Sequence, residues 1–308
     1  MGEVPLYQQT IAEKVSCTGI GLHSGAPAQL SLFPARANTG MVFVRTDRGV
    51  PVEIPARASE VASTDFATTL GRNAACVGTV EHLLAALYGL EIDNVRIEID
   101  GPELPVMDGS AAPFVYLIRS AGIFTQSEPR SVLRVRRKLE VVDGDRRISI
   151  EPARDLRISY AVDFAHPAIR RQELQIDRME PEIFERDISA ARTFGFLNEV
   201  HALWNAGFAL GGGLENAVLL DDEKVINPDG LRWEDEFVRH KVLDFFGDLA
   251  LVGMPVQGHV RVERGGHALH QKLVAAILAN SDAWDVVQAG KQGARGIRLA
   301  RVAAAARF

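Results

Sequence analysis

The stretch LRWEDEFVRHKVLDFFGDLALV (residues 231–252) is the most informative segment for the fold. Apolar residues recur in it at helical spacing, which predicts a helix from about Leu231 to Val252. Residues at intervals of four lie on one side of a helix, so one side carries three polar groups, His240, Asp244 and Asp248, with Lys241 beside them. The opposite face is apolar and consists of Val238, Val242, Phe245, Phe246 and Leu249.

This polar stripe has two interpretations. An amphipathic helix usually turns such a stripe to water, and the pattern alone favours that interpretation. Two details favour a buried stripe instead. Phe237 and Leu251 lie at its two ends, and histidine is mixed with carboxylates where exposed stripes favour Lys and Glu. His and Asp four residues apart can also bind one metal ion.

A second segment, GTVEHLL (78–84), predicts the start of a helix over Val80–Tyr88, with Thr79 as N-cap and Gly89 as the stop. Taken alone, it indicates an exposed Glu and a half-buried His. Combined with the long helix, His82, His240 and Asp244 form a donor set suited to catalytic Zn²⁺ with one position left for water. Glu81 would then be available as a general base.

A third segment, RGGHALH (264–270), places His267 after two glycines that allow close backbone approach. The plain interpretation is an ordinary loop histidine. The functional interpretation is a general acid, with Asp248 of the long helix stabilising its imidazolium form.

Composition limits the class of protein. The chain has 308 residues, 47% of them hydrophobic, and a net charge of -6, which argues against a general nucleic-acid binder. Two cysteines, Cys17 and Cys76, are too few for a disulfide framework. The start of the chain lacks the apolar core of a signal peptide, and no apolar run approaches the roughly 18 residues of a membrane span. We therefore expect a cytoplasmic protein.

Strand-like segments precede helices in each half of the chain, which favours an α+β fold. Residues 124–131 are polar, contain a proline and have no periodicity, so we place a domain boundary there. This predicts an N-terminal domain over residues 1–126 and a C-terminal domain over residues 127–308. We expect the C-terminal tail to be a frayed or surface segment.

Five motifs together resemble the LpxC family, the UDP-3-O-acyl-N-acetylglucosamine deacetylases of lipid A biosynthesis. They are TVEHL (79–83), NVRIEIDGPELPVMDGSAAPF (94–114), ARTFGF (191–196), DGLRWEDEFVRHKVLD (229–244) and GHAL (266–269). The resemblance runs from about residue 8 to about residue 280. It implies two β/α domains packed as a sandwich, with two outer sheets around inner helices and one insert in each domain.

The resemblance also implies a role for each matching position. The zinc ligands would be His82, His240 and Asp244. The catalytic groups would be Glu81 as base, His267 as proton donor, Asp248 as its partner, and Thr193 as oxyanion donor. Contacts to the sugar and nucleotide would come from Phe194, Lys241, Arg264, Arg146 and Phe164. One departure is that Ala67 stands where many members carry a cysteine close to the metal.

The segment FGFLNEVHALWNAGF (194–208) is rich in aromatic and aliphatic residues at mixed spacing. By pattern alone, a plain core segment and a lipid-binding segment are equally acceptable. With the resemblance, we expect a passage for the acyl chain of a UDP-3-O-acyl-N-acetylglucosamine substrate, lined by Phe196, Leu197, Val200, Leu203, Trp204 and Phe208. We expect a monomer. There are two alternatives. The substrate could be another acylated amino sugar, or the protein could be a metal-stabilised binding protein without catalysis.

Overall fold

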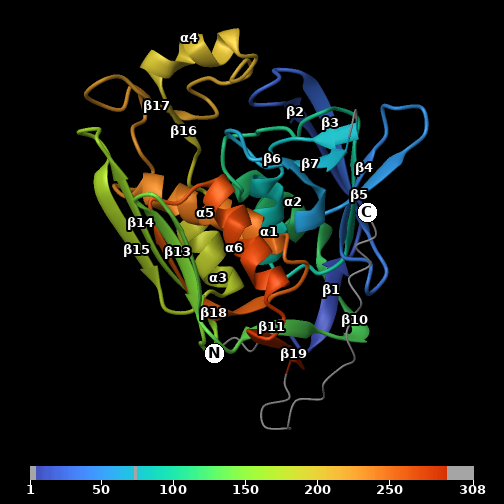
Figure 1. The fold of residues 1–308 in the computed structure, drawn as a ribbon. Helices are drawn as coiled ribbons and strands as arrows, with labels where there is room; N and C mark the ends of the chain where they lie inside the picture. Colours follow the sequence, from blue (N-terminus) through green and yellow to red (C-terminus); the bar gives the residue numbers. More distant parts are fainter. Residues whose placement is uncertain (1–4, 73–74, 290–308) are drawn as a thin grey trace.

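The computed structural model describes residues 5–72 and 75–289. Two sheets form the outer layers and the main helices lie between them (Figure 1). The first sheet has the order β2-β3-β9-β4-β5. Its strands are β2 (Val15–Ile20), β3 (Pro27–Pro34), β4 (Met41–Arg45), β5 (Val52–Pro55) and β9 (Val95–Ile99). Every second residue of β9 is fully buried, as expected for a strand with one face on the core.

The second sheet has the order β12-β13-β18-β11-β19, and β14 joins β15 to it through β18. Its strands are β11 (Ser131–Val135), β12 (Leu139–Asp143), β13 (Arg146–Glu151), β14 (Leu156–Phe164), β15 (Arg170–Ile176), β18 (Val256–Glu263) and β19 (Trp284–Gln288). The helices between the sheets are α1 (Glu81–Gly89), α2 (Ala112–Ala121), α5 (Glu236–Ala250) and α6 (His267–Ala279). The predicted sandwich of two outer sheets around inner helices is confirmed.

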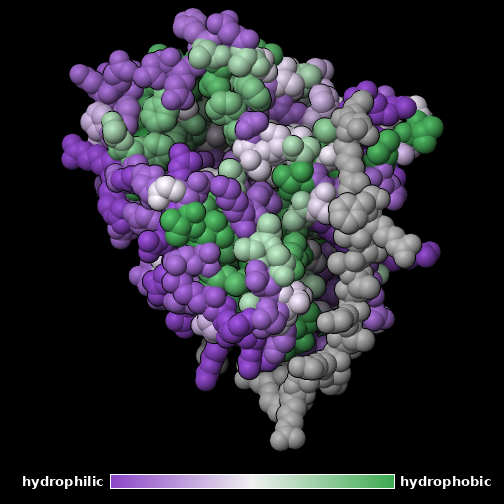
Figure 2. Space-filling model, in the orientation of Figure 1, coloured by the Kyte–Doolittle hydropathy of each residue, from purple (hydrophilic) through white to green (hydrophobic). Residues whose placement is uncertain are grey.

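Each half also carries an insert. The first is a small antiparallel sheet of β6 (Val61–Ser63), β7 (Thr69–Arg72) and β8 (Ala75–Val77), preceded by the 3-10 turn η1 (Ala58–Glu60). The second contains β16 (Phe194–Phe196), α4 (Leu197–Asn205) and β17 (Val218–Leu220), after α3 (Pro181–Ile183) and η2 (Phe184–Ile188). Apolar residues gather around α4 beneath a more polar outer rim (Figure 2). In the part of the chain that is described, no helix is both long and apolar enough to cross a membrane.

The polar stripe of the long helix is buried. His240, Asp244 and Asp248 on α5 are at most 2% exposed, so the solvated interpretation of that stripe is wrong. The reason is that α5 lies at the centre of the molecule, where α1 covers it on one side and α6 packs against it as well. Both faces of this helix are therefore inside the protein.

Three local expectations are corrected by the structure. The long helix begins at Glu236, later than expected. Thr79 does not cap α1, because its hydroxyl donates to Glu103 Oε1 at 2.7 Å. Residues 124–131 are not an irregular linker, since β10 (Ile123–Pro129) pairs antiparallel with β1 (Tyr7–Ile11). The expectation for the C-terminal tail concerns residues outside the described part.

Arg130 anchors the chain where the two halves join. Its Nε donates to Asp93 Oδ1 at 2.8 Å, and its Nη1 lies 3.2 Å from Glu91 Oε1. The Arg130 side chain is only 4% exposed. Burial raises the pKa of Glu91 and of Asp93, and the guanidinium charge opposes that rise. Arg130 therefore opposes the effect of burial on two half-buried carboxylates.

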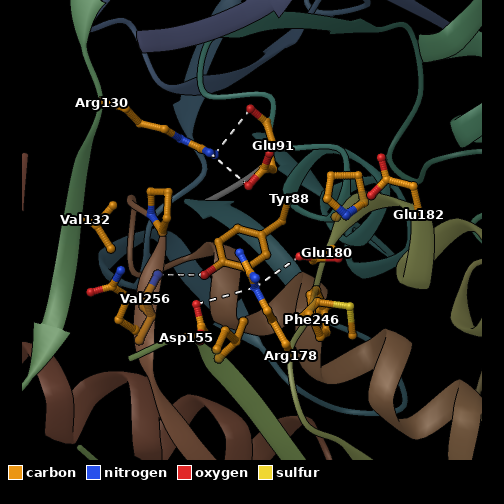
Figure 3. A pocket seen from close by; sticks show the side chains of 16 residues that line it. Tyr88, Glu91, Arg130, Val132, Asp155, Arg178, Glu180, Glu182, Phe246 and Val256 are labelled. Atoms are coloured by element: carbon orange, nitrogen blue, oxygen red, sulfur yellow. Dashed lines mark hydrogen bonds and ion pairs between the residues drawn. The ribbon is translucent and has the colours of Figure 1, made fainter. Parts of the chain in front are cut away.

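A cavity of about 170 Å³ lies beside this junction and is lined from both halves of the chain (Figure 3). Its walls include Tyr88, Arg130 and Phe246. The Tyr88 hydroxyl accepts a hydrogen bond from the Val256 N–H at 3.0 Å, which ties the end of α1 to β18. Arg178 lies between Asp155 and Glu180 and forms ion pairs with both. Arg130 and Tyr88 therefore join the two halves at this cavity, whereas the ion pairs of Arg178 lie within the second half.

We expect Arg130→Met to destabilise the protein by about 1–3 kcal/mol, because it leaves two half-buried carboxylates without their charged partner. Denaturant unfolding followed by circular dichroism measures the loss. Arg134→Met is the matched control, because it removes only the half-exposed pair with Asp285 and should cost about 1 kcal/mol or less. Equal losses in the two variants would contradict the role of Arg130.

Candidate active site

Three helices meet at one point and supply the polar groups predicted for the site. Glu81 and His82 are the first two residues of α1, and His267 is the first residue of α6. The middle of α5 supplies His240 and Asp244. Three groups of close metal-type donors result among the described residues, one of them formed by Asp248, His267 and His270; the other two share Asp244. Of these two, the first contains His82, His240 and Asp244, and the second contains Glu81, Asp244 and His267.

The geometry of the first group fits a tetrahedral ion. The Nε2 of His240 lies 3.2 Å from Asp244 Oδ1, and the Nε2 of His82 lies 3.7 Å from the same oxygen. Bonds of about 2.1 Å to a tetrahedral Zn²⁺ place ligand atoms about 3.4 Å apart. His240 donates its Nδ1–H to the Ala191 carbonyl at 3.0 Å, which leaves Nε2 with a free lone pair. The residues present therefore suit a metal ion.

The protonation states of His240 and Asp244 also suit the binding of a metal ion. Burial lowers the pKa of His240 to about 3, so its imidazole is neutral and able to bind a cation. Burial by itself would raise the pKa of Asp244, but His240 and Lys241 hold it well below its usual range. The Nζ of Lys241 donates to Asp244 Oδ2 at 2.8 Å. The donor set thus consists of a neutral imidazole and an ionised carboxylate, completed by His82.

His267 lies among three carboxylates. Its Nδ1–H donates to Asp248 Oδ2 at 2.8 Å, and its Nε2 lies 3.8 Å from Glu81 Oε1 and 3.9 Å from Asp244 Oδ2. Burial would lower the pKa of His267, but the charge and hydrogen bond of Asp248 raise it to about 9. Burial also raises the pKa of Glu81. At neutral pH His267 is therefore a protonated acid, with Nε2–H on the side of Glu81.

Three residues around Asp248 were missed by the sequence analysis. Thr68 and Gln271 donate to its Oδ1, at 2.5 Å and 3.0 Å, and His270 donates its Nδ1–H to Oδ2 at 2.8 Å. The neutral His270 in turn accepts from the Tyr160 hydroxyl at 2.9 Å. His270 and Gln271 could have been found, because they follow His267 on the same turn of helix. Thr68 is far away in the sequence and gave no such signal.

The aromatic residues predicted to contact substrate lie together beside the metal donors. Phe164 is 5.6 Å from Phe194 and 6.1 Å from Phe196, between ring centroids. The Phe194 ring is also 6.2 Å from the ring of His240. Lys241 Nζ lies 5.4 Å from the Phe194 ring centroid, so a cation and an aromatic face border the site.

Thr193 is positioned by its backbone. Its N–H donates to the Gly109 carbonyl at 2.8 Å, and its carbonyl accepts from the Val218 N–H at 2.7 Å. Two residues earlier in the chain, the Ala191 carbonyl holds His240. The same short segment therefore carries Thr193 and orients a metal donor.

The two arginines predicted on the nucleotide side lie at the surface. Arg264 forms ion pairs with Asp163, at 2.5 Å, and with Asp145. Arg146 is exposed and is the residue after Asp145. The β12–β13 turn and the end of β18 thus bring both guanidinium groups to one edge of the second sheet.

The segment predicted to hold the acyl chain is exposed. No residue of α4 is buried, so the plain-core interpretation is wrong for this helix. Leu197 is 43% and Trp204 is 48% exposed. The Phe208 ring lies 4.9 Å from the Phe66 ring, which belongs to the first insert. The two inserts therefore touch through aromatic side chains.

Comparison with known proteins agrees with the geometry. The profile of the LpxC family, described as UDP-3-O-acyl N-acetylglycosamine deacetylase, matches residues 8–279. The chain belongs to the LpxC family. It is 51% identical over 292 residues to the UDP-3-O-acyl-N-acetylglucosamine deacetylase of Myxococcus xanthus (strain DK1622), covering 95% of this chain and 93% of that protein.

Two further relatives carry the same name. The protein of Shewanella oneidensis is 48% identical over 289 residues, which is 93% of this chain and 94% of the relative. The protein of Citrifermentans bemidjiense is 49% identical over 283 residues, which is 92% of each chain. Such coverage shows that the family relation spans both sheets and both inserts.

We expect Asp248→Asn to lower the pKa of His267 from about 9 towards its ordinary value of about 6.5, because the variant removes the charge that stabilises imidazolium. Histidine-labelled NMR of the metal-free protein, titrated from pH 5 to pH 10, measures the change. The folded-state pKa exceeds the unfolded value, so the stability contributed by His267 is complete below about pH 6.5 and is lost as the pH rises through about 9. An unchanged titration in the variant would contradict the assignment of Asp248.

Proposed function

We propose that the chain hydrolyses the acetamide of a UDP-3-O-(3-hydroxyacyl)-N-acetylglucosamine and releases acetate and the 2-amino sugar nucleotide, as a zinc-dependent step of lipid A biosynthesis. One observation carries the proposal: in a member of this deacetylase family, Glu81 and His267 stand beside a three-donor metal set. A metal that only stabilised a fold would need neither group. This juxtaposition favours catalysis over a purely structural or binding role.

The metal would be held by His82, His240 and Asp244, and two imidazoles with one carboxylate are typical of catalytic Zn²⁺. When bound, Zn²⁺ lowers the pKa of a coordinated water towards about 7 and polarises a carbonyl oxygen as a Lewis acid. The identity of the metal is part of the proposal.

The proton transfers are assigned to this chain's own side chains. Glu81 accepts the proton of the attacking water as the new C–O bond forms at the acetamide carbon. The hydroxyl of Thr193 donates a hydrogen bond to the oxygen that becomes negatively charged. His267, which is protonated at neutral pH, then gives its Nε2 proton to the nitrogen as the C–N bond breaks. Asp248 holds the imidazolium in place throughout.

Substrate recognition is assigned to the groups around this centre. The Phe194 face and Lys241 would contact the sugar, with Phe164 on the nucleotide side. Arg264 and Arg146 would bind the diphosphate. The ion pairs of Arg264 do not prevent this, since exposed pairs contribute little and can exchange partners.

The acyl chain would lie along the second insert, against Phe196, Leu197, Val200, Leu203, Trp204 and Phe208. The support is the exposed apolar surface around α4 (Figure 2). At about 0.8 kcal/mol for each buried CH₂, a long acyl chain would add substantially to binding. A requirement for an acylated substrate follows from this assignment.

We further propose that the protein acts as a monomer in the cytoplasm. All proposed catalytic and metal-binding side chains come from a single chain, so the centre does not need a second copy. Cys17 is not part of a disulfide, which accords with a reducing compartment.

Glu81→Gln should lower acetate release by about 10²–10⁴-fold, because it removes the general base while preserving shape. Zinc content, measured by elemental analysis of the purified protein, should stay equal to wild type. His82→Ala is the matched variant and should lose zinc as well as activity. Loss of zinc in Glu81→Gln would show that Glu81 is a ligand and not the base.

Acetate release from UDP-3-O-acyl-N-acetylglucosamine should disappear with a chelator and return when Zn²⁺ is added, because the metal polarises the reacting groups. A chain-length series and an acylated amino sugar without UDP test the alternative substrate. An equal rate on the acylated amino sugar without UDP would favour a different acylated amino sugar as the substrate. No acetate from the zinc-loaded protein would favour the non-catalytic alternative.

A further inference from the structure

Thr68 lies at the end of the loop between β6 and β7, in the first insert, and is completely buried. Its polar groups contact all three helices of the site, since its hydroxyl oxygen also lies 3.3 Å from His267 Nδ1 at the start of α6. Its backbone N–H donates to Glu81 Oε2 at 3.1 Å, and its carbonyl accepts from the Val80 N–H at 3.2 Å. Its hydroxyl donates to Asp248 Oδ1 at 2.5 Å. One residue therefore bridges the proposed base and the partner of the proposed acid.

We propose that Thr68 is a positioning residue that fixes Glu81 and the Asp248–His267 pair relative to each other. This inference rests on the proposed deacetylase function and goes beyond it, because Thr68 acts through Glu81 and Asp248 and bonds to none of the three proposed metal ligands. Its role is to set the separation between the group that takes a proton and the group that gives one.

The need for such a bridge follows from where the two carboxylates lie. Glu81 is on α1 and Asp248 is on α5, so they come from different halves of the chain. Both are buried, and a buried carboxylate without hydrogen-bond donors would be costly or would become protonated. Thr68 supplies a donor to each from one rigid backbone position. A shift of the loop would therefore displace both groups together.

The hydroxyl bond also differs from the other bonds to Asp248. Gln271 and His270 donate to the same carboxylate from α6, on the side of His267 itself. Among the four described donors to Asp248, Thr68 alone comes from the first half of the chain. Its short, charge-assisted bond restrains the carboxylate from the side of Glu81. Without it, Asp248 and His267 could move away from Glu81 as a unit.

The test compares Thr68→Val with Thr68→Ser. Valine has the shape of threonine and keeps the backbone bond to Glu81, but it removes the hydroxyl, whereas serine keeps the hydroxyl. We expect Thr68→Val to lower kcat by about 10- to 100-fold, as for other residues that orient active-site groups. KM should change by no more than about twofold, because substrate contacts are untouched. Thr68→Ser should recover most of kcat, with zinc content and melting temperature near wild type in both variants.

Thr69→Val is the matched control, since Thr69 is the adjacent residue, on β7, and half-buried. It should retain wild-type kcat. In an Asp248→Ala background, Thr68→Val should cost less than about twofold, because the two changes remove the same contact. Full kcat in Thr68→Val, additive losses in the double variant, or an equal rise in KM would each overturn the proposal.

A second measurement separates this proposal from the proposed function. The Nδ1–H proton of His267, bonded to Asp248, should give a downfield NMR signal that broadens in Thr68→Val and persists in Thr68→Ser. This readout needs no substrate. If the wild-type protein releases no acetate, the deacetylase function fails while the NMR comparison still judges Thr68. If wild type is active and Thr68→Val leaves both kcat and the signal unchanged, only the Thr68 proposal fails.

Discussion

The close contact between α1 and α5 is the constraint on which the site depends. Gly247 faces the first turn of α1, and a Cβ added there would lie 2.1 Å from the Glu81 carbonyl oxygen and 2.6 Å from its Cα. The two helix backbones therefore touch at this point, which only glycine permits. This contact places Glu81 and His82 alongside His240 and Asp244. A larger residue would separate Glu81 from the proposed metal donors on α5.

Burial then determines the chemistry of these groups. Each side chain of the site is almost inaccessible to water, so its charge depends on its nearest partners. Burial drives the pKa of Glu81 upward and that of His240 downward. The pKa of Asp248 is lowered, because the charge and hydrogen bonds of its histidine partners outweigh the effect of burial. Its negative charge in turn keeps His267 protonated. A carboxylate, a protonated imidazole and a neutral imidazole thus coexist in one buried site.

The two inserts complete the centre from opposite sides. The first supplies Thr68 to the catalytic carboxylates and Phe66 to the surface. The second begins immediately after Thr193 and carries the apolar helix α4. The rings of Phe66 and Phe208 lie 4.9 Å apart between centroids, so the two inserts are in contact. In this molecule the sheets and central helices hold the reacting groups, while the inserts shape access to them.

Much of this protein could be predicted from the amino-acid sequence. Helical periodicity located α5 and placed its three polar residues on one side, because that depends only on local geometry. Long motifs identified the family and the donor set. The local pattern could not decide whether the stripe faced water or the interior, because burial of α5 depends on α1 and α6, which are distant in the chain.

The tertiary structure alone decided the remaining features. Most of the polar segment 124–131 lies in strand β10 (Ile123–Pro129), because β1 offers a partner that no local pattern reveals. The bridge from Thr68 to Glu81 and Asp248 spans 13 and 180 residues of sequence. Such contacts arise only when packing brings separate segments together. The sequence therefore determined which chemical groups the site contains. The tertiary structure determined their protonation and their alignment, because both depend on burial and on contacts between distant segments.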